Sequence, residues 1–200
     1  MNENALSALT IGHSSHTLER FMALLQQYRV TALADVRSMP YSRFSPQFNR
    51  TPLKEHLSEN GIRYVFLGRE LGARPEDPSC YIDGRVQYRK LAQTALFMSG
   101  IERVTKGAAK YRIALMCAER DPLDCHRTLL IGRALVDLFV QVDHVLSDGS
   151  LESHADAMSR LLNLTSIPDQ DLFRSRAELI SEALKKQEDR IAYLDPNRSP

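Results

Sequence analysis

Five side chains that can take part in chemistry lie within one short stretch of the sequence: Cys117, Glu119, Cys125, His126 and Arg127. Thiol, carboxyl and imidazole groups can act as nucleophiles and proton carriers, and thiol and imidazole groups are also common zinc ligands. A lone cysteine is often only a small core residue, and an arginine is common on surfaces. The combination of all five favours a functional site over a packed core.

The sequence around this group predicts a strand, a short turn and then a helix. Residues 113–116 form an unbroken apolar run, and residues 128–140 carry apolar side chains at helical spacing. Asp121 fits a helix N-cap and Pro122 fits the first helical position, so we expect Cys125 in the first turn. The helix dipole and the two basic residues that follow Cys125 would then lower its pKa and favour the thiolate.

Strand patterns recur along the chain, with helical patterns between them. The strands are expected at residues 8–12, 31–36, 62–67, 113–116 and 141–147. This alternation predicts the α/β class, as a single domain with a five-stranded, mainly parallel sheet flanked by helices. An open Rossmann-like sheet and a partial barrel both fit the pattern. We expect the α/β domain at residues 1–167 and a charged helical extension with a disordered end at residues 168–200.

Polar residues follow several predicted strands, and the carboxyl ends of parallel strands gather such residues at one edge of the sheet. The candidates for substrate binding are His13, Asp35, Arg37, Ser42, Arg43, Arg69 and Arg127. Structural explanations stay open for some of them: His13 can satisfy a loop, Asp35 and Arg37 can form an internal ion pair, and Arg43 can be a solvated loop residue. We expect a polar pocket at this edge.

Composition narrows the class of protein and of partner. The chain has 26 Lys and Arg against 25 Asp and Glu, so its net charge of +1 predicts no global attraction to nucleic acid. Three cysteines without a spaced framework argue against a disulfide scaffold and for a reducing compartment, which we take to be the cytoplasm. No apolar run suits a signal peptide or a membrane span, so we expect no membrane partner.

Several short motifs, in order along the chain, resemble one known family. They are Thr10-Ile11-Gly12-His13-Ser14, Asp35-Val36-Arg37 with Pro40, Ser42-Arg43-Phe44 and Phe48, Leu71-Gly72, Cys117-Ala118-Glu119 and Cys125-His126-Arg127. This set, spread over residues 9–148, is similar to the family catalogued as domain of unknown function 488. The resemblance implies a cytosolic bacterial α/β domain. It implies no particular reaction and carries no catalytic assignment.

The leading hypothesis is an enzyme with a cysteine-centred polar site. Cys125 would be the nucleophile, and Glu119 or His126 would move protons. Arginines would bind an anionic substrate that contains a phosphate or nucleotide group. This hypothesis needs no cofactor.

Two alternatives belong to other classes of protein. Cys117, Cys125 and His126 offer enough ligands for zinc, although adjacent residues on a helix point about 100° apart, which weakens this reading. A loop at residues 43–50, with arginines and phenylalanines, can instead bind a nucleic-acid component without catalysis. The C-terminal extension can support a homodimer.

Overall fold

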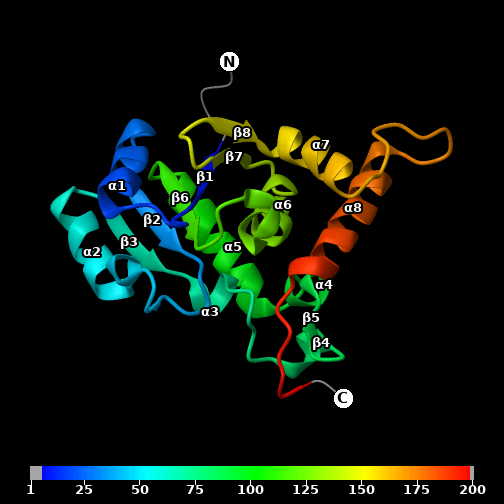
Figure 1. The fold of residues 1–200 in the computed structure, drawn as a ribbon, viewed down its shortest axis with the longest axis horizontal. Coiled ribbons are helices and arrows are strands. Elements are labelled where there is room, and N and C mark those ends of the chain that lie inside the picture. Colours follow the sequence, from blue (N-terminus) through cyan, green and yellow to red (C-terminus); the bar gives the residue numbers. More distant parts are fainter. Residues whose placement is uncertain (1–5, 199–200) are drawn as a thin grey trace.

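Six strands form the main sheet, and the computed structural model describes residues 6–198. The strands are β1 (Ser7–Gly12), β2 (Ala32–Asp35), β3 (Arg63–Phe66), β6 (Ile113–Cys117), β7 (Gln141–Val145) and β8 (Leu151–Ser153). Their order is β3-β2-β6-β1-β7-β8, as Figure 1 shows. The pairs among the first five strands are parallel, and β8 is antiparallel to β7. The two edge strands do not pair with each other, so the sheet is open rather than a closed barrel.

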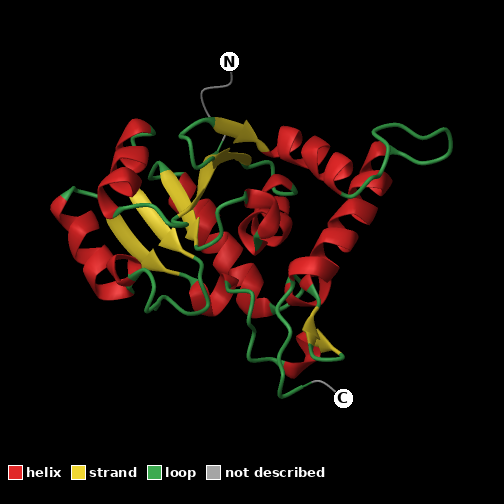
Figure 2. Cartoon of the chain, in the orientation of Figure 1, coloured by secondary structure: helices red, strands yellow, loops and turns green. Residues whose placement is uncertain are grey.

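Helices cover both faces of the sheet (Figure 2). One face packs against α1 (Leu18–Gln27) and α2 (Arg50–Glu59). The other face packs against α5 (Ala95–Ala108), α6 (Arg133–Val136), α7 (His154–Leu164) and α8 (Arg176–Ile191). The short elements are α3 (Gly68–Leu71), α4 (Tyr88–Leu91) and a hairpin of β4 (Tyr81–Ile82) with β5 (Arg85–Val86). Across residues 6–198, no helix is long and apolar enough to cross a membrane.

The alternation of side chains along β6 decides which face of the sheet carries the cysteine. Ile113, Leu115 and Cys117 belong to the core under α5–α8, whereas Ala114 and Met116 belong to the core under α1 and α2. This is the two-residue period of an extended strand. Cys117 therefore ends the strand on the face where the chain continues into the next helix.

The sixth strand, β8, is additional to the five strands expected from the sequence. Gly149, with a φ of +99°, allows a tight turn that returns the chain beside β7 as β8. The helix begins only at His154, because the Ser153 side chain accepts a hydrogen bond from the backbone N–H of Asp156 and so caps it.

The segment after residue 167 shares the core of the sheet domain. In α8, Leu179, Ala183 and Leu184 are buried in the same cluster as the residues of β6. The Gln187 side chain donates a hydrogen bond of 3.0 Å to the carbonyl of Leu123. The apolar stripe of α8 therefore packs against the rest of the chain.

The end of the chain makes ordered contacts up to the last described residues. The backbone N–H of Asp195 donates to the carbonyl of Gly84 at 2.8 Å, and Arg198 donates to the carbonyl of Glu76 at 3.2 Å. The disordered end expected from the sequence falls partly on residues 199–200, which lie outside the described residues.

Leu179→Ala should lower the free energy of unfolding by about 2–5 kcal/mol, because the side chain is fully buried and its removal leaves a cavity in the core. Leu172→Ala is the matched control: Leu172 is 94% exposed, and its change should stay within about 0.5 kcal/mol. Urea unfolding measures both variants. Equal effects of the two changes would show that α8 does not belong to the cooperative core.

Candidate functional site

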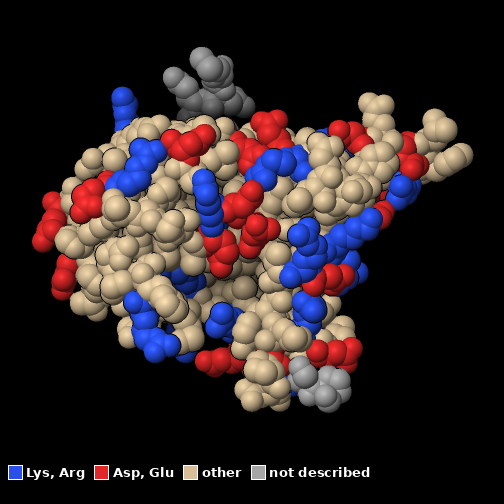
Figure 3. Space-filling view, viewed as in Figure 1, with Lys and Arg blue, Asp and Glu red and all other residues tan. Residues whose placement is uncertain are grey.

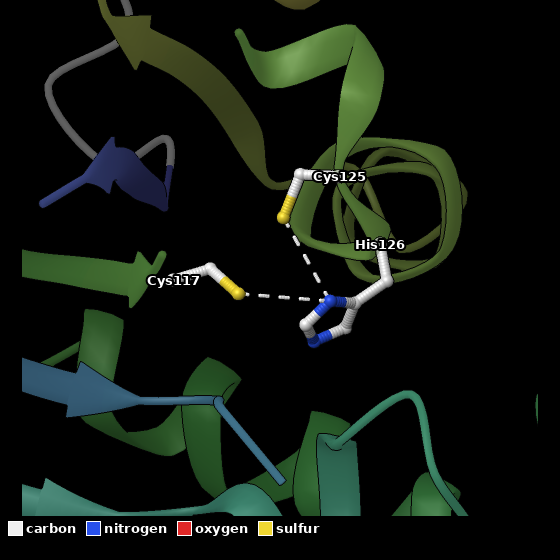
Figure 4. Close-up of side chains that lie close together, drawn as sticks. All are labelled: Cys117, Cys125 and His126. Carbon is white, nitrogen blue, oxygen red and sulfur yellow. Dashed lines mark hydrogen bonds between the residues drawn. The ribbon is translucent and has the colours of Figure 1, made fainter. Parts of the chain in front are cut away.

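Three of the predicted chemical side chains meet at the carboxyl edge of the sheet (Figure 4). Cys117 ends β6, and Cys125 and His126 stand at the start of the following helix. The Nδ1 atom of His126 lies 3.7 Å from the Sγ atom of each cysteine, and the three donor atoms lie within 4.8 Å of one another. All three residues are buried. This cluster, Cys117-Cys125-His126, could hold a metal ion.

The position of Cys125 differs from the prediction, and the difference brings the cluster together. Asp121 caps only a short 3₁₀ turn, Pro122–Asp124, and not the helix itself. Cys125 then has an extended backbone, with φ −139° and ψ 141°, and precedes the helix. The helix opens with a widened π turn over Arg127–Gly132. The 100° separation expected between Cys125 and His126 on a regular helix therefore does not apply.

The imidazole of His126 is oriented by the neighbouring strand. Its Nε2 atom lies 3.1 Å from the carbonyl oxygen of Val36, the residue that follows β2. A carbonyl only accepts hydrogen bonds, so Nε2 carries the proton and donates it. Burial lowers the pKa of His126, but the charge of Cys125 outweighs burial and raises it above the ordinary value. When the ring is neutral, with its one proton on Nε2, the lone pair of Nδ1 faces the two sulfur atoms, as in a histidine that binds a metal.

The shortest polar contact of the Cys117-Cys125-His126 cluster joins Cys125 to Glu119. The Oε2 atom of Glu119 lies 2.9 Å from the Sγ atom of Cys125, at the rim of the cluster. Burial and the neighbouring sulfur raise the pKa of the Glu119 carboxyl group. One proton is thus shared between a carboxyl group and a thiol, and the two groups titrate as a pair.

The two cysteines differ in acidity. Burial by itself raises the pKa of Cys125, but its hydrogen bond with Cys117 and the charges of Arg127 and His126 outweigh burial and lower that pKa well below its ordinary value. The same hydrogen bond, together with burial, raises the pKa of Cys117. Cys125 is therefore the more acidic thiol of the pair.

A cavity of about 230 Å³ opens against the cluster. Besides the cluster and Glu119, its walls include Arg37, Ser38, Arg74, Tyr88, Ile191 and Tyr193. No sequence pattern pointed to Arg74, Tyr88, Ile191 or Tyr193, because they come from a long loop, a short helix and the C-terminal segment. The cavity is smaller than the roughly 300–1,000 Å³ of sites for drug-sized ligands, so it has room only for a small molecule.

The arginine at the end of the second strand is held by an internal network. Arg37 donates from Nη2 and Nε to the Asp35 carboxylate, at 2.7 and 2.9 Å. It also donates to the Phe48 carbonyl at 2.8 Å and to Nε2 of His13 at 3.2 Å. The structure thus shows the internal ion pair that the sequence left open. Arg37 borders the cavity, while these bonds direct its guanidinium inward.

Arg127 is fully buried and supports the loop after β6. It donates to the carbonyl oxygens of Glu119 at 2.8 Å and Arg120 at 3.2 Å, and its Nε finds no partner among residues 6–198. It does not line the cavity. Its place in the structure is that of a positioning residue rather than a substrate contact.

The remaining predicted substrate contacts lie away from the cluster. Arg43 and Arg69 are exposed, and Ser42 accepts hydrogen bonds from the backbone N–H groups of Phe44 and Ser45. None of the three predicted residues borders the cavity. The structure therefore does not bring them to the site.

Comparison with known proteins identifies the family. The family model described as "Domain of unknown function DUF488" matches residues 17–134. The chain belongs to the DUF488 family. The match contains Asp35, Arg37 and the whole Cys117-Cys125-His126 cluster, whereas His13 and α8 lie outside it. Searches of curated proteins and of solved structures found no match.

Gly12, at the end of β1, lies where the backbone of the loop after β6 comes too close for any side chain. Parallel pairing continues past β1 and β6, since the N–H of His13 donates to the Cys117 carbonyl at 2.9 Å. A Cβ atom on Gly12 would lie 1.9 Å from the carbonyl oxygen of Glu119. Only glycine lets the loop that carries Glu119 lie this close to β1.

Gly12→Ala should displace that loop and lower the free energy of unfolding by about 1–3 kcal/mol, as overpacking does elsewhere. Gly107→Ala in α5 serves as the control. Its new Cβ would meet only the Ile113 side-chain end at 3.2 Å, and alanine is about 1 kcal/mol more favourable than glycine inside a helix. Urea unfolding of both variants decides the point, and a Gly12→Ala protein as stable as the parent would contradict it.

His13, which accepts a hydrogen bond from Arg37, should make the stability of the fold depend on pH. The ring is 5% exposed and stacks on Phe48 with a centroid separation of 4.5 Å. Burial, followed by the charge of Arg37, lowers the pKa of His13 from 6.5 to about 4. His13 is therefore neutral in the folded protein across the range where the unfolded chain takes up a proton.

The free energy of unfolding should fall as the pH drops from 6.5 to 4. In this range His13 takes up a proton in the unfolded state but stays neutral in the folded state. This one group should contribute a slope of about 1.4 kcal/mol per pH unit. His13→Gln should reduce the slope by about that amount, and buried His144, whose pKa is lowered to about 3, should maintain the rest. Urea unfolding across this pH range gives the slopes, and equal slopes for parent and variant would rule out His13 as a source.

Proposed function

We propose that this DUF488 protein is a zinc-dependent enzyme whose metal is held by Cys117, Cys125 and His126. The observation that carries the proposal is the distance of 3.7 Å from Nδ1 of His126 to each Sγ atom. Tetrahedral zinc, with bonds of about 2.3 Å to sulfur and about 2.0–2.1 Å to nitrogen, needs nitrogen–sulfur separations of about 3.5 Å. The two nitrogen–sulfur distances would change by only tenths of an ångström to reach that geometry.

The number of ligands favours catalysis over a structural role. Structural zinc sites have four protein ligands, whereas catalytic sites have three and keep one position for water or substrate. The cavity beside the cluster provides room for that fourth position. Zinc would supply a Lewis acid that activates water or polarises a substrate oxygen. Glu119, whose carboxylate lies at the rim, would take up or deliver the proton.

The hydrogen bond from His126 to Val36 supports the same proposal. Metal-binding histidines usually donate their second ring N–H to a carbonyl or carboxylate, which orients the ring and fixes the tautomer. The substrate side of the proposal is a small anionic molecule, since the cavity is small and has an arginine at its edge. The protein would work in the cytoplasm, where the three free cysteines stay reduced.

A second candidate is a metal-free enzyme in which Cys125 is the nucleophile. The lowered pKa of Cys125 and the proton shared with Glu119 favour it. A nucleic-acid module is supported by Phe44, which is 93% exposed next to Arg43. Figure 3, however, shows both acidic and basic side chains over the face of the molecule in view rather than one continuous basic surface.

Full-length protein purified without chelator should contain stoichiometric zinc by elemental analysis. Cys117→Ser, Cys125→Ser and His126→Ala should each reduce the zinc content at least tenfold, because each removes one of three ligands. Cys80→Ala is the matched control: Cys80 is a fully buried cysteine outside the cluster, and its loss should leave the zinc content unchanged.

Alkylation of Cys125 separates the two candidates. With zinc bound, Cys125 should resist iodoacetamide until a chelator is added. Absence of zinc together with fast alkylation of Cys125 at mildly acidic pH would exclude the zinc enzyme and favour the thiolate enzyme. A Cys125 that stays unreactive with and without chelator, in a protein free of zinc, would exclude both.

A further inference from the structure

We infer that Arg74 binds the anionic group of the substrate, and that this group is a small carboxylate or phosphate held at the edge of the cavity while the rest of the molecule reaches the cysteine cluster. The inference deepens the proposed function and rests on it in one respect, that the cavity beside the cluster is the substrate site. It does not require a bound metal.

The charges around the cavity leave one cation available. Arg37 is paired with Asp35 at 2.7 Å, and Asp124 accepts a hydrogen bond of 3.0 Å from Gln187. Arg74 borders the same cavity and is exposed, and no ion pair engages its guanidinium within the described part of the chain. Glu119 and Asp124 also border the cavity, so the positive charge that would attract an anion is local to the exposed guanidinium of Arg74.

The guanidinium of Arg74 is held in a defined position. Its central carbon lies 4.5 Å from the centroid of the Tyr193 ring, and its backbone N–H donates to the Ser38 hydroxyl at 3.1 Å. Tyr193 is fixed in turn, because its carbonyl accepts a hydrogen bond of 3.0 Å from the N–H of Val86. A guanidinium stacked by its face keeps the N–H groups at its edge available for two parallel bonds to a carboxylate or phosphate.

The arginines favoured by the sequence cannot take this role in the observed structure. Arg37 and Arg127 direct their guanidinium groups to buried partners. Arg43 and Arg69 do not border the cavity. The support for Arg74 comes from Tyr193, which lies beyond residues 17–134, so a segment outside the family match completes the anion site.

The test compares two alkylating probes that differ in charge. Iodoacetate and iodoacetamide react with a thiolate in the same way: the sulfur forms a bond to carbon and iodide leaves. The full chain, treated with chelator, is alkylated with each probe, and peptide mass spectrometry measures the rate at Cys125. The ratio of the iodoacetate rate to the iodoacetamide rate should exceed that of glutathione about tenfold, which corresponds to about 1.4 kcal/mol.

Arg74→Gln should return this ratio to the glutathione value, and Arg74→Lys should retain only part of it, because lysine cannot form the paired bonds. Tyr193→Phe should keep the ratio, since the stacking ring remains, whereas Tyr193→Ala should reduce it. Arg89→Gln removes an exposed charge on α4 outside this cavity and should change nothing. An unchanged ratio in Arg74→Gln would overturn the inference.

Inorganic phosphate and acetate, added as competitors, identify the anion. Whichever slows alkylation of the parent protein at the lower concentration, without slowing Arg74→Gln, is the preferred class. Equal effects on both proteins would contradict a site at Arg74.

A second measurement applies if the buried thiols resist both probes. In protein loaded with cobalt, the visible spectrum should report binding of 3-mercaptopropionate about tenfold tighter than its neutral amide, and Arg74→Gln should abolish the difference. Equal affinities in the parent protein would overturn the inference. Where the thiols do react and show the charge dependence, failure to bind cobalt or zinc would refute the metal and leave the anion site standing.

Discussion

The parallel pairing of β6 with both β1 and β2 is the constraint on which the site depends. Backbone bonds extend this pairing past the strands, where Met116 and Cys117 accept hydrogen bonds from Val36 and His13. The carboxyl ends of β1, β2 and β6 are thereby aligned at one edge of the sheet. The carbonyl of Val36 is then placed to accept a hydrogen bond from Nε2 of His126, and Cys117 lies opposite Cys125 and His126. Without this register, the donor atoms of Cys117, Cys125 and His126 would not lie close enough to bind one metal ion.

Two buried arginines stabilise that edge by different means. Arg37 has a carboxylate partner, Asp35, and the pair ties the end of β2 to the loop that contains Phe48. Within residues 6–198, the partners of Arg127 are carbonyl groups, so no carboxylate offsets its charge, which acts on the nearby Cys125 thiol. Burying a charge is costly unless it is bound by good partners, and both side chains direct their donors to fixed acceptors. Arginine near a reactive group can therefore serve the structure rather than the ligand.

The site is assembled from segments far apart in the chain. The sheet and the loop after β6 supply the sulfur, nitrogen and carboxylate atoms, and the loop after α3 supplies the available cation. The C-terminal segment contributes Ile191 and Tyr193 to the lining of the cavity. Reactive atoms thus lie on the rigid strand edge, while the groups that would select a ligand come from loops and from the end of the chain, where change disturbs the core least.

The sequence by itself determined the α/β class, five of the six strands and the residues of the cysteine cluster. These features are local: they follow from apolar periods and from residue types close together in the chain. Only the tertiary structure decided that Cys125 precedes its helix, because that depends on where a 3₁₀ turn ends against the packed core. The partners of each arginine were likewise beyond the sequence. Arg37 and Arg74 look equally free as residue types, and only packing against Asp35 or Tyr193 separates a structural cation from an available one.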